Sequence, residues 1–139
     1  RVKAEPDALV TMSEHLELSA QLDGGLVGGM MRSVLGQESL FVQTVVARQR
    51  GDAVFAAPSV GDVELLRVTP AEPLLLQKGA FLASDDAVDV STAVQGNVGN
   101  ALFSGAGLFL LRASGSGTLA VNAHGSILRY ELAVGETRA

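Results

Sequence analysis

The chain contains no cysteine and no tryptophan. The absence of cysteine excludes disulfide bonds, thiolate metal ligands and cysteine nucleophiles. Aromatic residues are also few, with five phenylalanines and one tyrosine, and the arginines are scattered along the sequence. A stacking platform for single-stranded nucleic acid needs aromatic rings placed between cations, and the sequence shows no such arrangement.

Basic residues are outnumbered by acidic ones. Ten lysines and arginines against fifteen aspartates and glutamates give a formal net charge of −5. The chain as a whole therefore offers no electrostatic attraction to a phosphate backbone or to anionic lipid. We predict that it has no nucleic-acid partner.

Long hydrophobic runs are missing too. The most apolar window, residues 101–111, is interrupted by Ser104 and by two glycines, and it is far shorter than the roughly 20 residues that a membrane-spanning helix needs. No transmembrane segment is predicted. The sequence opens at Arg1 without a methionine or an apolar signal core, so we expect a fragment or a processed chain.

What the sequence does contain is a series of strand signals. With 139 residues, 47% of them hydrophobic, the chain is long enough to form a single β domain with its own core. Short apolar and β-branched runs between Gly, Pro, Asp and Asn predict strands, and helical periodicity is nearly absent. One short helix is allowed between Met30 and Leu35. The predicted strands are residues 8–12, 16–22, 40–47, 53–57, 63–68, 74–77, 81–84, 88–94, 108–113, 118–123 and 127–133.

The chain repeats itself. Residues 7–10 and 16–19 match residues 79–82 and 88–91 at an offset of 72, residues 40–42 match 108–110 at 68, and Gly61 matches Gly125 at 64. This phase predicts two similar units, residues 1–73 and 74–139, joined in an antiparallel sandwich or prism. The last residues occupy the phase of a new unit, so we expect a longer native chain with a third related unit.

A glycine-rich segment, residues 24–31, resembles a phosphate-binding loop at first sight. No Gly-Lys-Ser/Thr follows it and no βαβ pattern surrounds it, so a wide loop is the better interpretation. The matching segment of the second unit, residues 95–103, keeps this design. Exposed apolar loop residues mark interfaces or membrane-surface contacts, and the predicted interface residues are Leu26, Val27, Met30, Met31, Val98, Leu102 and Phe103.

No catalytic, cofactor-binding or metal-binding residue is predicted. The two histidines, His15 and His124, do not occupy matching positions of the repeat. The cluster of Asp85, Asp86 and Asp89 at a strand entrance is typical of a turn and a solvated face. Ser104 and Ser114 lack the nucleophile-elbow pattern.

Several segments resemble the "altered inheritance of mitochondria" family and its bacterial relatives. In the first unit the resemblance rests on residues 4–13, on the double-glycine loop with Arg32, and on residues 35–36 and 38–41; in the second it rests on residues 77–84, 103–109 and 115–117. It implies a fold like that of the tryptophan RNA-binding attenuation protein, trimers or larger rings, and a third unit. The mitochondrial member is associated with inner-membrane organisation. Asp7 departs from the family's glycine, and aspartate also tolerates such a turn.

Together these observations predict a non-enzymatic, homo-oligomeric β scaffold that acts through protein contacts. Action close to a membrane is compatible with this prediction. The alternative is a small-ligand-binding module with a site between the repeats or subunits, near the loops of Gly24 and Gly96. An enzyme is the least favoured of the three. We expect a cytoplasmic location in a bacterium.

Overall fold

The structure is a computed structural model of the chain, and it describes residues 1–22, 41–92 and 110–138. These residues form antiparallel sheets and one turn of 3-10 helix, η1, and contain no α-helix, so the predicted all-β class is confirmed. The elements in chain order are β1 (Val2–Ala4), β2 (Leu9–Met12), β3 (Leu16–Leu22), β4 (Phe41–Ala47), β5 (Ala53–Phe55), β6 (Val63–Val68), β7 (Leu74–Gln77), η1 (Lys78–Ala80), β8 (Phe81–Asp85), β9 (Val88–Thr92), β10 (Leu110–Gly115) and β11 (Gly117–Asn122).

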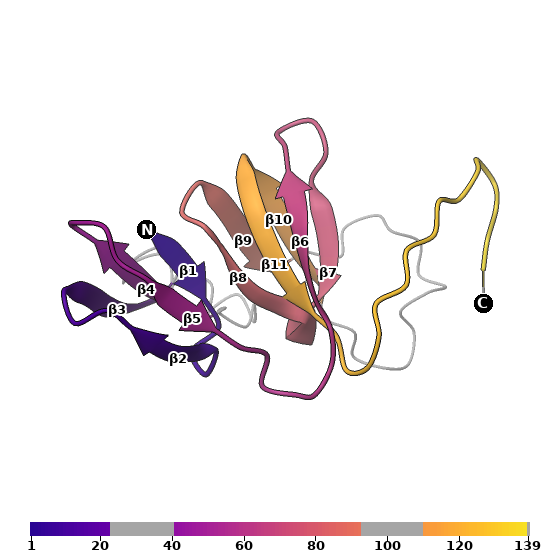
Figure 1. Cartoon of the computed structure of the whole chain (residues 1–139). Helices are drawn as coiled ribbons and strands as arrows, with labels where there is room; N and C mark the ends of the chain where they lie inside the picture. The colour runs from indigo at the N-terminus through magenta and orange to yellow at the C-terminus, as the bar shows by residue number, and fades with distance from the viewer. Residues whose placement is uncertain (23–40, 93–109, 139) are drawn as a thin grey trace.

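The strands of the described chain assemble into three sheets (Figure 1). The largest has the order β3-β4-β1-β8-β11-β6, so that it mixes strands from both halves of the sequence. A second sheet has the order β7-β10-β9, and a third consists of β2 and β5 alone. The short strand β1 joins the halves, because Lys3 is paired with Thr44 of β4 on one side and with Ser84 of β8 on the other.

The core follows from the period-2 alternation of the strands. In β9, Val88 and Val90 are buried and Asp89 between them is exposed, as expected for a strand with one wet face. The main core cluster comprises Val42, Val68, Leu76, Phe81, Val88, Val90, Leu111, Ala113, Leu119 and Val121. A smaller cluster lies around β1 and comprises Ala4, Ala8, Leu82 and Ala83.

Most predicted strands are present, with two differences. Strand β1 was not predicted, since three residues with a lysine in the middle carry almost no local strand signal. The strand predicted at residues 127–133 is wrong: these residues have the alternating sequence of a strand but form none, because no other segment of the described chain pairs with them. The short helix predicted near Met30 lies outside the described residues, and the resemblance to the attenuation protein stays a prediction.

Candidate interaction surface

The interface residues predicted from the sequence lie outside the described part of the chain. This applies to all seven, namely Leu26, Val27, Met30, Met31, Val98, Leu102 and Phe103. The alternative ligand site near the loops of Gly24 and Gly96 lies outside it as well. The strands themselves form another exposed apolar surface, which the sequence did not predict.

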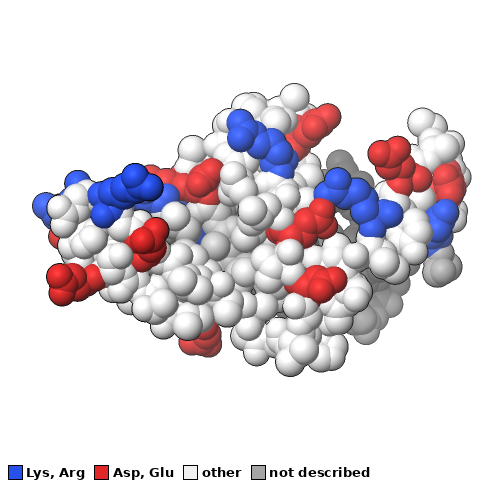
Figure 2. All heavy atoms as spheres, in the orientation of Figure 1, with Lys and Arg blue, Asp and Glu red and all other residues white. Residues whose placement is uncertain are grey.

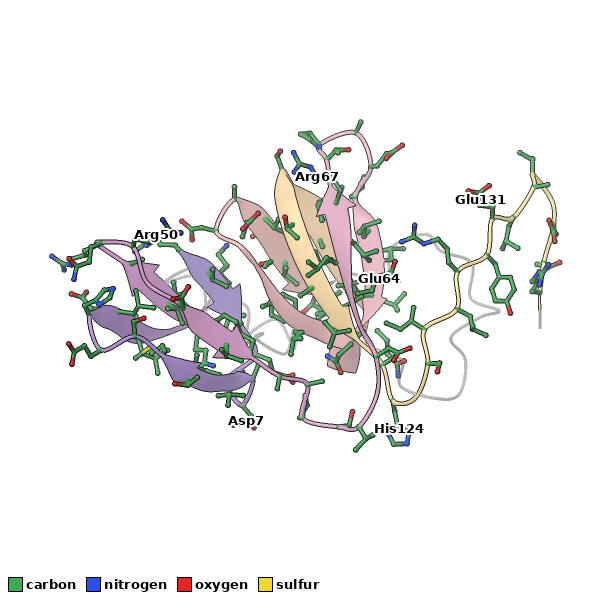
Figure 3. All side chains as sticks on the ribbon, viewed as in Figure 1. Asp7, Arg50, Glu64, Arg67, His124 and Glu131 are labelled. Carbon is green, nitrogen blue, oxygen red and sulfur yellow. The ribbon has the colours of Figure 1, made fainter. Side chains whose placement is uncertain are left out.

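The two histidines serve different surroundings. The Nε2 atom of His15 lies 2.8 Å from the backbone carbonyl oxygen of Arg50 and so ties the β2–β3 turn to the β4–β5 turn. His124 is exposed in the segment that follows β11. Arg50 and His124 lie in different parts of the molecule (Figure 3), so the structure does not bring the histidines together. In the described ranges, no three His, Asp or Glu side chains cluster as a metal site would need.

The aspartates at the β8–β9 turn make structural contacts with other elements. Asp85 accepts a hydrogen bond of 2.7 Å on Oδ2 from the backbone N–H of Thr118, and Asp86 lies 3.8 Å from the guanidinium of Arg1. Asp89 points outward from β9. These contacts match the turn and solvated-face interpretation of the cluster.

A polar row crosses the centre of the large sheet. Thr44, Lys3 and Ser84 are cross-strand neighbours on β4, β1 and β8, and Thr44 and Ser84 are buried. The ammonium of Lys3 donates a hydrogen bond of 3.1 Å to the carbonyl oxygen of Val88. Lys3 therefore ties β1 to the start of β9.

The carboxyl group of Glu5 is perturbed by its surroundings. Desolvation by burial, and to a smaller extent the carboxylate of Asp7, raise the pKa of its carboxyl above the ordinary value. Its Oε2 atom is buried without a hydrogen-bond partner among the described residues. The Gln43 side-chain amide donates to the backbone carbonyl of Glu5 at 2.9 Å and does not reach this carboxylate.

Exposed apolar side chains gather on strand edges that carry no neighbour in the described chain. The lone pair β2–β5 exposes Val10 and Val54, and the edge strand β7 exposes Leu75. An unpaired strand edge presents free backbone N–H and C=O groups, which other strands can bind. Apolar side chains beside such an edge add to its tendency to associate.

The segment after β11, residues 127–134, forms an arm that runs away from the sheets (Figure 1). Its base is fixed to β6: the backbone N–H of Ile127 donates to Oδ2 of Asp62 at 3.0 Å, and Arg129 forms an ion pair with Glu64. The apolar side chains Leu128, Tyr130, Leu132 and Val134 of this segment are exposed. We call residues 127–134 the C-terminal arm.

Charges of both signs are interspersed over the face of the molecule shown in Figure 2. No region of this face has the continuous positive charge that a nucleic-acid interface requires. Among the described residues, no helix is long and apolar enough to cross a membrane.

A family model described as "Mitochondrial biogenesis AIM24" matches residues 1–138. The chain belongs to the AIM24 family. The resemblance stated from the sequence is therefore confirmed over nearly its whole length. Membership of the AIM24 family shows common ancestry and assigns no chemical activity to any residue.

Two bacterial relatives of this AIM24 chain come from Streptococcus pyogenes. The uncharacterised protein M6_Spy0233 of serotype M6 is 32% identical over 138 residues, which are 94% of this chain and 55% of the relative. The crystal structure of protein SPYM3_0169 has a TM-score of 0.68 and 30% identity, with 90% of this chain and 55% of that chain covered. The chain thus spans about half the length of the relatives that it matches.

Proposed function

We propose that this AIM24 chain is a non-enzymatic β scaffold of the bacterial cytoplasm that self-associates and acts through protein–protein contacts. The observation that carries the proposal is the set of exposed apolar side chains beside open strand edges, with Leu75 of β7 at 61% exposure as the clearest case. An edge strand with free backbone groups and exposed apolar side chains is a site for strand addition. Self-association covers such edges without a separate partner.

The polar side chains support a structural role. The ring of His15 binds a backbone carbonyl, the carboxylate of Asp85 caps a backbone N–H, and the ammonium of Lys3 binds another carbonyl. Each of these groups stabilises a turn or joins two strands. General acid–base catalysis would instead need such groups to converge on a substrate position.

If the protein acts close to a membrane, we propose that it is held there by a protein partner and not by direct binding to lipid. The net charge of −5 opposes attraction to the anionic lipids of a membrane surface. The apolar strand edges are better suited to another β protein, since their backbone groups require hydrogen-bond partners that lipid cannot supply.

The test compares two substitutions by size-exclusion chromatography with light scattering at micromolar concentrations. We expect the unmodified chain to exceed the monomer mass and Leu75→Lys to shift it toward the monomer. Val60→Lys is the matched control, because Val60 is 89% exposed but lies in a bend and not on a strand. A monomer mass for the unmodified chain would contradict the proposal, and so would an equal effect of the two substitutions.

A further inference from the structure

Two three-stranded ribbons of the molecule pair in the same register. Subtracting 72 from the residue numbers of β9 and 68 from those of β10 converts all five of their pairs into pairs of β3 with β4; Val88 opposite Gly115, for example, becomes Leu16 opposite Ala47. The same two offsets convert three of the four pairs of β7 with β10 into the three pairs of β1 with β4. In pairing, β7 is therefore the counterpart of β1.

The strand pairs β2–β5 and β8–β11 also match, including their irregularity. Adding 72 to the numbers of β2 and 66 to those of β5 gives all three pairs of β8 with β11. Both pairs skip one residue at the same place, Val10 in β2 and Leu82 in β8. A β-bulge at equivalent positions is a specific feature, so β2–β5 is the counterpart of β8–β11.

The two strand pairs differ in what lies beside them. Strands β8 and β11 are enclosed between β1 and β6, whereas β2 and β5 carry no neighbour on either outer edge in the described chain. The exposure of the skipped residues follows this difference: Leu82 is 2% exposed and Val10 is 64% exposed. The pair β2–β5 thus resembles β8–β11 with both neighbouring strands removed.

The missing neighbours have counterparts elsewhere in the same chain. Strand β7, the counterpart of β1, is an edge strand. The C-terminal arm follows Gly125 as β6 follows Gly61, 64 residues earlier. Among the described strands there is therefore one filled junction, β1-β8-β11-β6, and both halves of a second one whose strands are not paired with each other.

We propose that the β2–β5 pair of one copy of this chain inserts between β7 and the C-terminal arm of a second copy. The resulting order, β9-β10-β7-β2-β5-arm, repeats that of the large sheet. We assign a second copy as the occupant because the described residues carry the inserted pair and the receiving edges at once. Insertion of a further repeat unit of the same polypeptide is the competing outcome, and it would leave the chain monomeric. This inference rests on the self-association proposed above and specifies the surfaces that form it.

The register of the new contact follows from the filled junction. The pair Lys3–Ser84 of β1 and β8 corresponds to Leu75 of one copy opposite Met12 of the other. The pair Leu65–Ala120 of β6 and β11 corresponds to Arg129 opposite Val54. In this register Leu128, Tyr130 and Leu132 take the places of Glu64, Leu66 and Val68, whose side chains are the less exposed ones of β6. The apolar face of the arm would then be turned inward and its charged residues outward.

The contact joins different surfaces of the two copies, so it is heterologous. Such contacts form closed rings or open filaments, depending on the rotation between copies. Each copy would use its β2–β5 pair toward one neighbour and its β7 and C-terminal arm toward the other.

Disulfide trapping tests the inference directly, because the chain has no cysteine of its own. The doubly substituted chain Val54→Cys, Arg129→Cys is oxidised and run on a non-reducing gel, and Met12→Cys, Leu75→Cys probes the other edge. Residues directly opposite on paired strands lie within disulfide reach. We expect covalent dimers and larger multimers from both variants.

The matched control is Val54→Cys, Leu128→Cys, because a shift of one residue turns the side chain to the other face of the strand. We expect the in-register variants to give about ten times more covalent multimer than this control, since disulfides form only within a narrow range of geometry. Far-UV circular dichroism checks that each variant is folded.

The outcomes separate this inference from the proposal on which it rests. If light scattering shows association but the in-register variants cross-link no more than the control, the proposed register is wrong and the proposed self-association still stands. A monomeric chain would overturn both. A fast-migrating monomer with an internal disulfide would show that the arm binds its own β5, which also contradicts the inference.

Discussion

Gly61 and Gly125 form an isolated parallel bridge that fixes the base of the C-terminal arm beside β6. The backbone N–H of Asp62 donates to the carbonyl oxygen of Gly125 at 2.8 Å, and the N–H of Gly125 donates to the carbonyl oxygen of Val60 at 3.2 Å. The two glycines are also the residues that the sequence repeat matched at an offset of 64. The arm therefore starts from a defined position.

The bridge predicts the effect of a methyl group at residue 61. A Cβ atom there would lie 1.8 Å from the carbonyl oxygen of Ala123, so Gly61→Ala must displace backbone. We expect a loss of about 1–3 kcal/mol in the free energy of unfolding, as for other overpacked sites, measured by urea denaturation. Gly79→Ala is the control, because nothing lies within 4 Å of its added Cβ. Equal stability of the two variants would contradict the bridge geometry.

The core predicts a larger loss at Leu119. This side chain is fully buried in the main cluster, so Leu119→Ala removes buried methyl groups and leaves a cavity. We expect it to lower the free energy of unfolding by about 2–5 kcal/mol. The exposed Leu65 of β6 is the comparison, and Leu65→Ala should change stability by less than about 0.5 kcal/mol. Similar losses at both positions would show that the assignment of the core is wrong.

Glu5 predicts a dependence of stability on pH. Its carboxyl has a raised pKa in the folded chain, so the folded state binds its proton more tightly than the unfolded state does. Stability contributed by this group is full below the unfolded pKa and is lost as pH rises through the folded pKa. Glutamine does not titrate, so Glu5→Gln removes this loss of stability at high pH. The melting temperature of the variant should exceed that of the unmodified chain at neutral pH but not at pH 4.

The control for this pH effect is Glu72→Gln, which changes an exposed carboxylate. It should leave the difference between the two pH values as in the unmodified chain. If Glu5→Gln raised the melting temperature equally at both pH values, the effect would come from packing and not from titration.

The strands show how far local sequence predicts this fold. The alternation of Val88, Asp89 and Val90 is a property of neighbouring residues, and the structure buries the two valines and exposes the aspartate as this alternation predicts. Strand β1 depends instead on pairing with β4 and β8, which lie about 40 and 80 residues away in the sequence and whose contribution local propensity does not contain. The same limit explains the arm, whose residues alternate like a strand but find no partner in the described chain.

The candidate surface was less predictable than the fold. An apolar loop residue such as Met30 can be recognised in a sequence as a possible contact. The exposure of Leu75 cannot, because it depends on β7 being an edge strand, which in turn depends on the order of the whole sheet. Sequence reasoning therefore predicted association without locating the open edges.

The arm predicts a further change in association. Tyr130→Ser with Leu132→Ser removes two exposed apolar side chains that would be covered in the assembly. We expect weaker self-association in size-exclusion chromatography and an unchanged melting temperature of the dilute monomer. Leu18→Ser is the control, since Leu18 is also exposed but lies on β3, outside the proposed junction. A larger effect at Leu18 would contradict the location of the contact.

The most direct measurement is sedimentation velocity of the unmodified chain over a range of micromolar concentrations. The account predicts species larger than one chain, either a ring of fixed size or assemblies that grow with concentration as copies add head to tail. A single species with the mass of one chain at every concentration would contradict it.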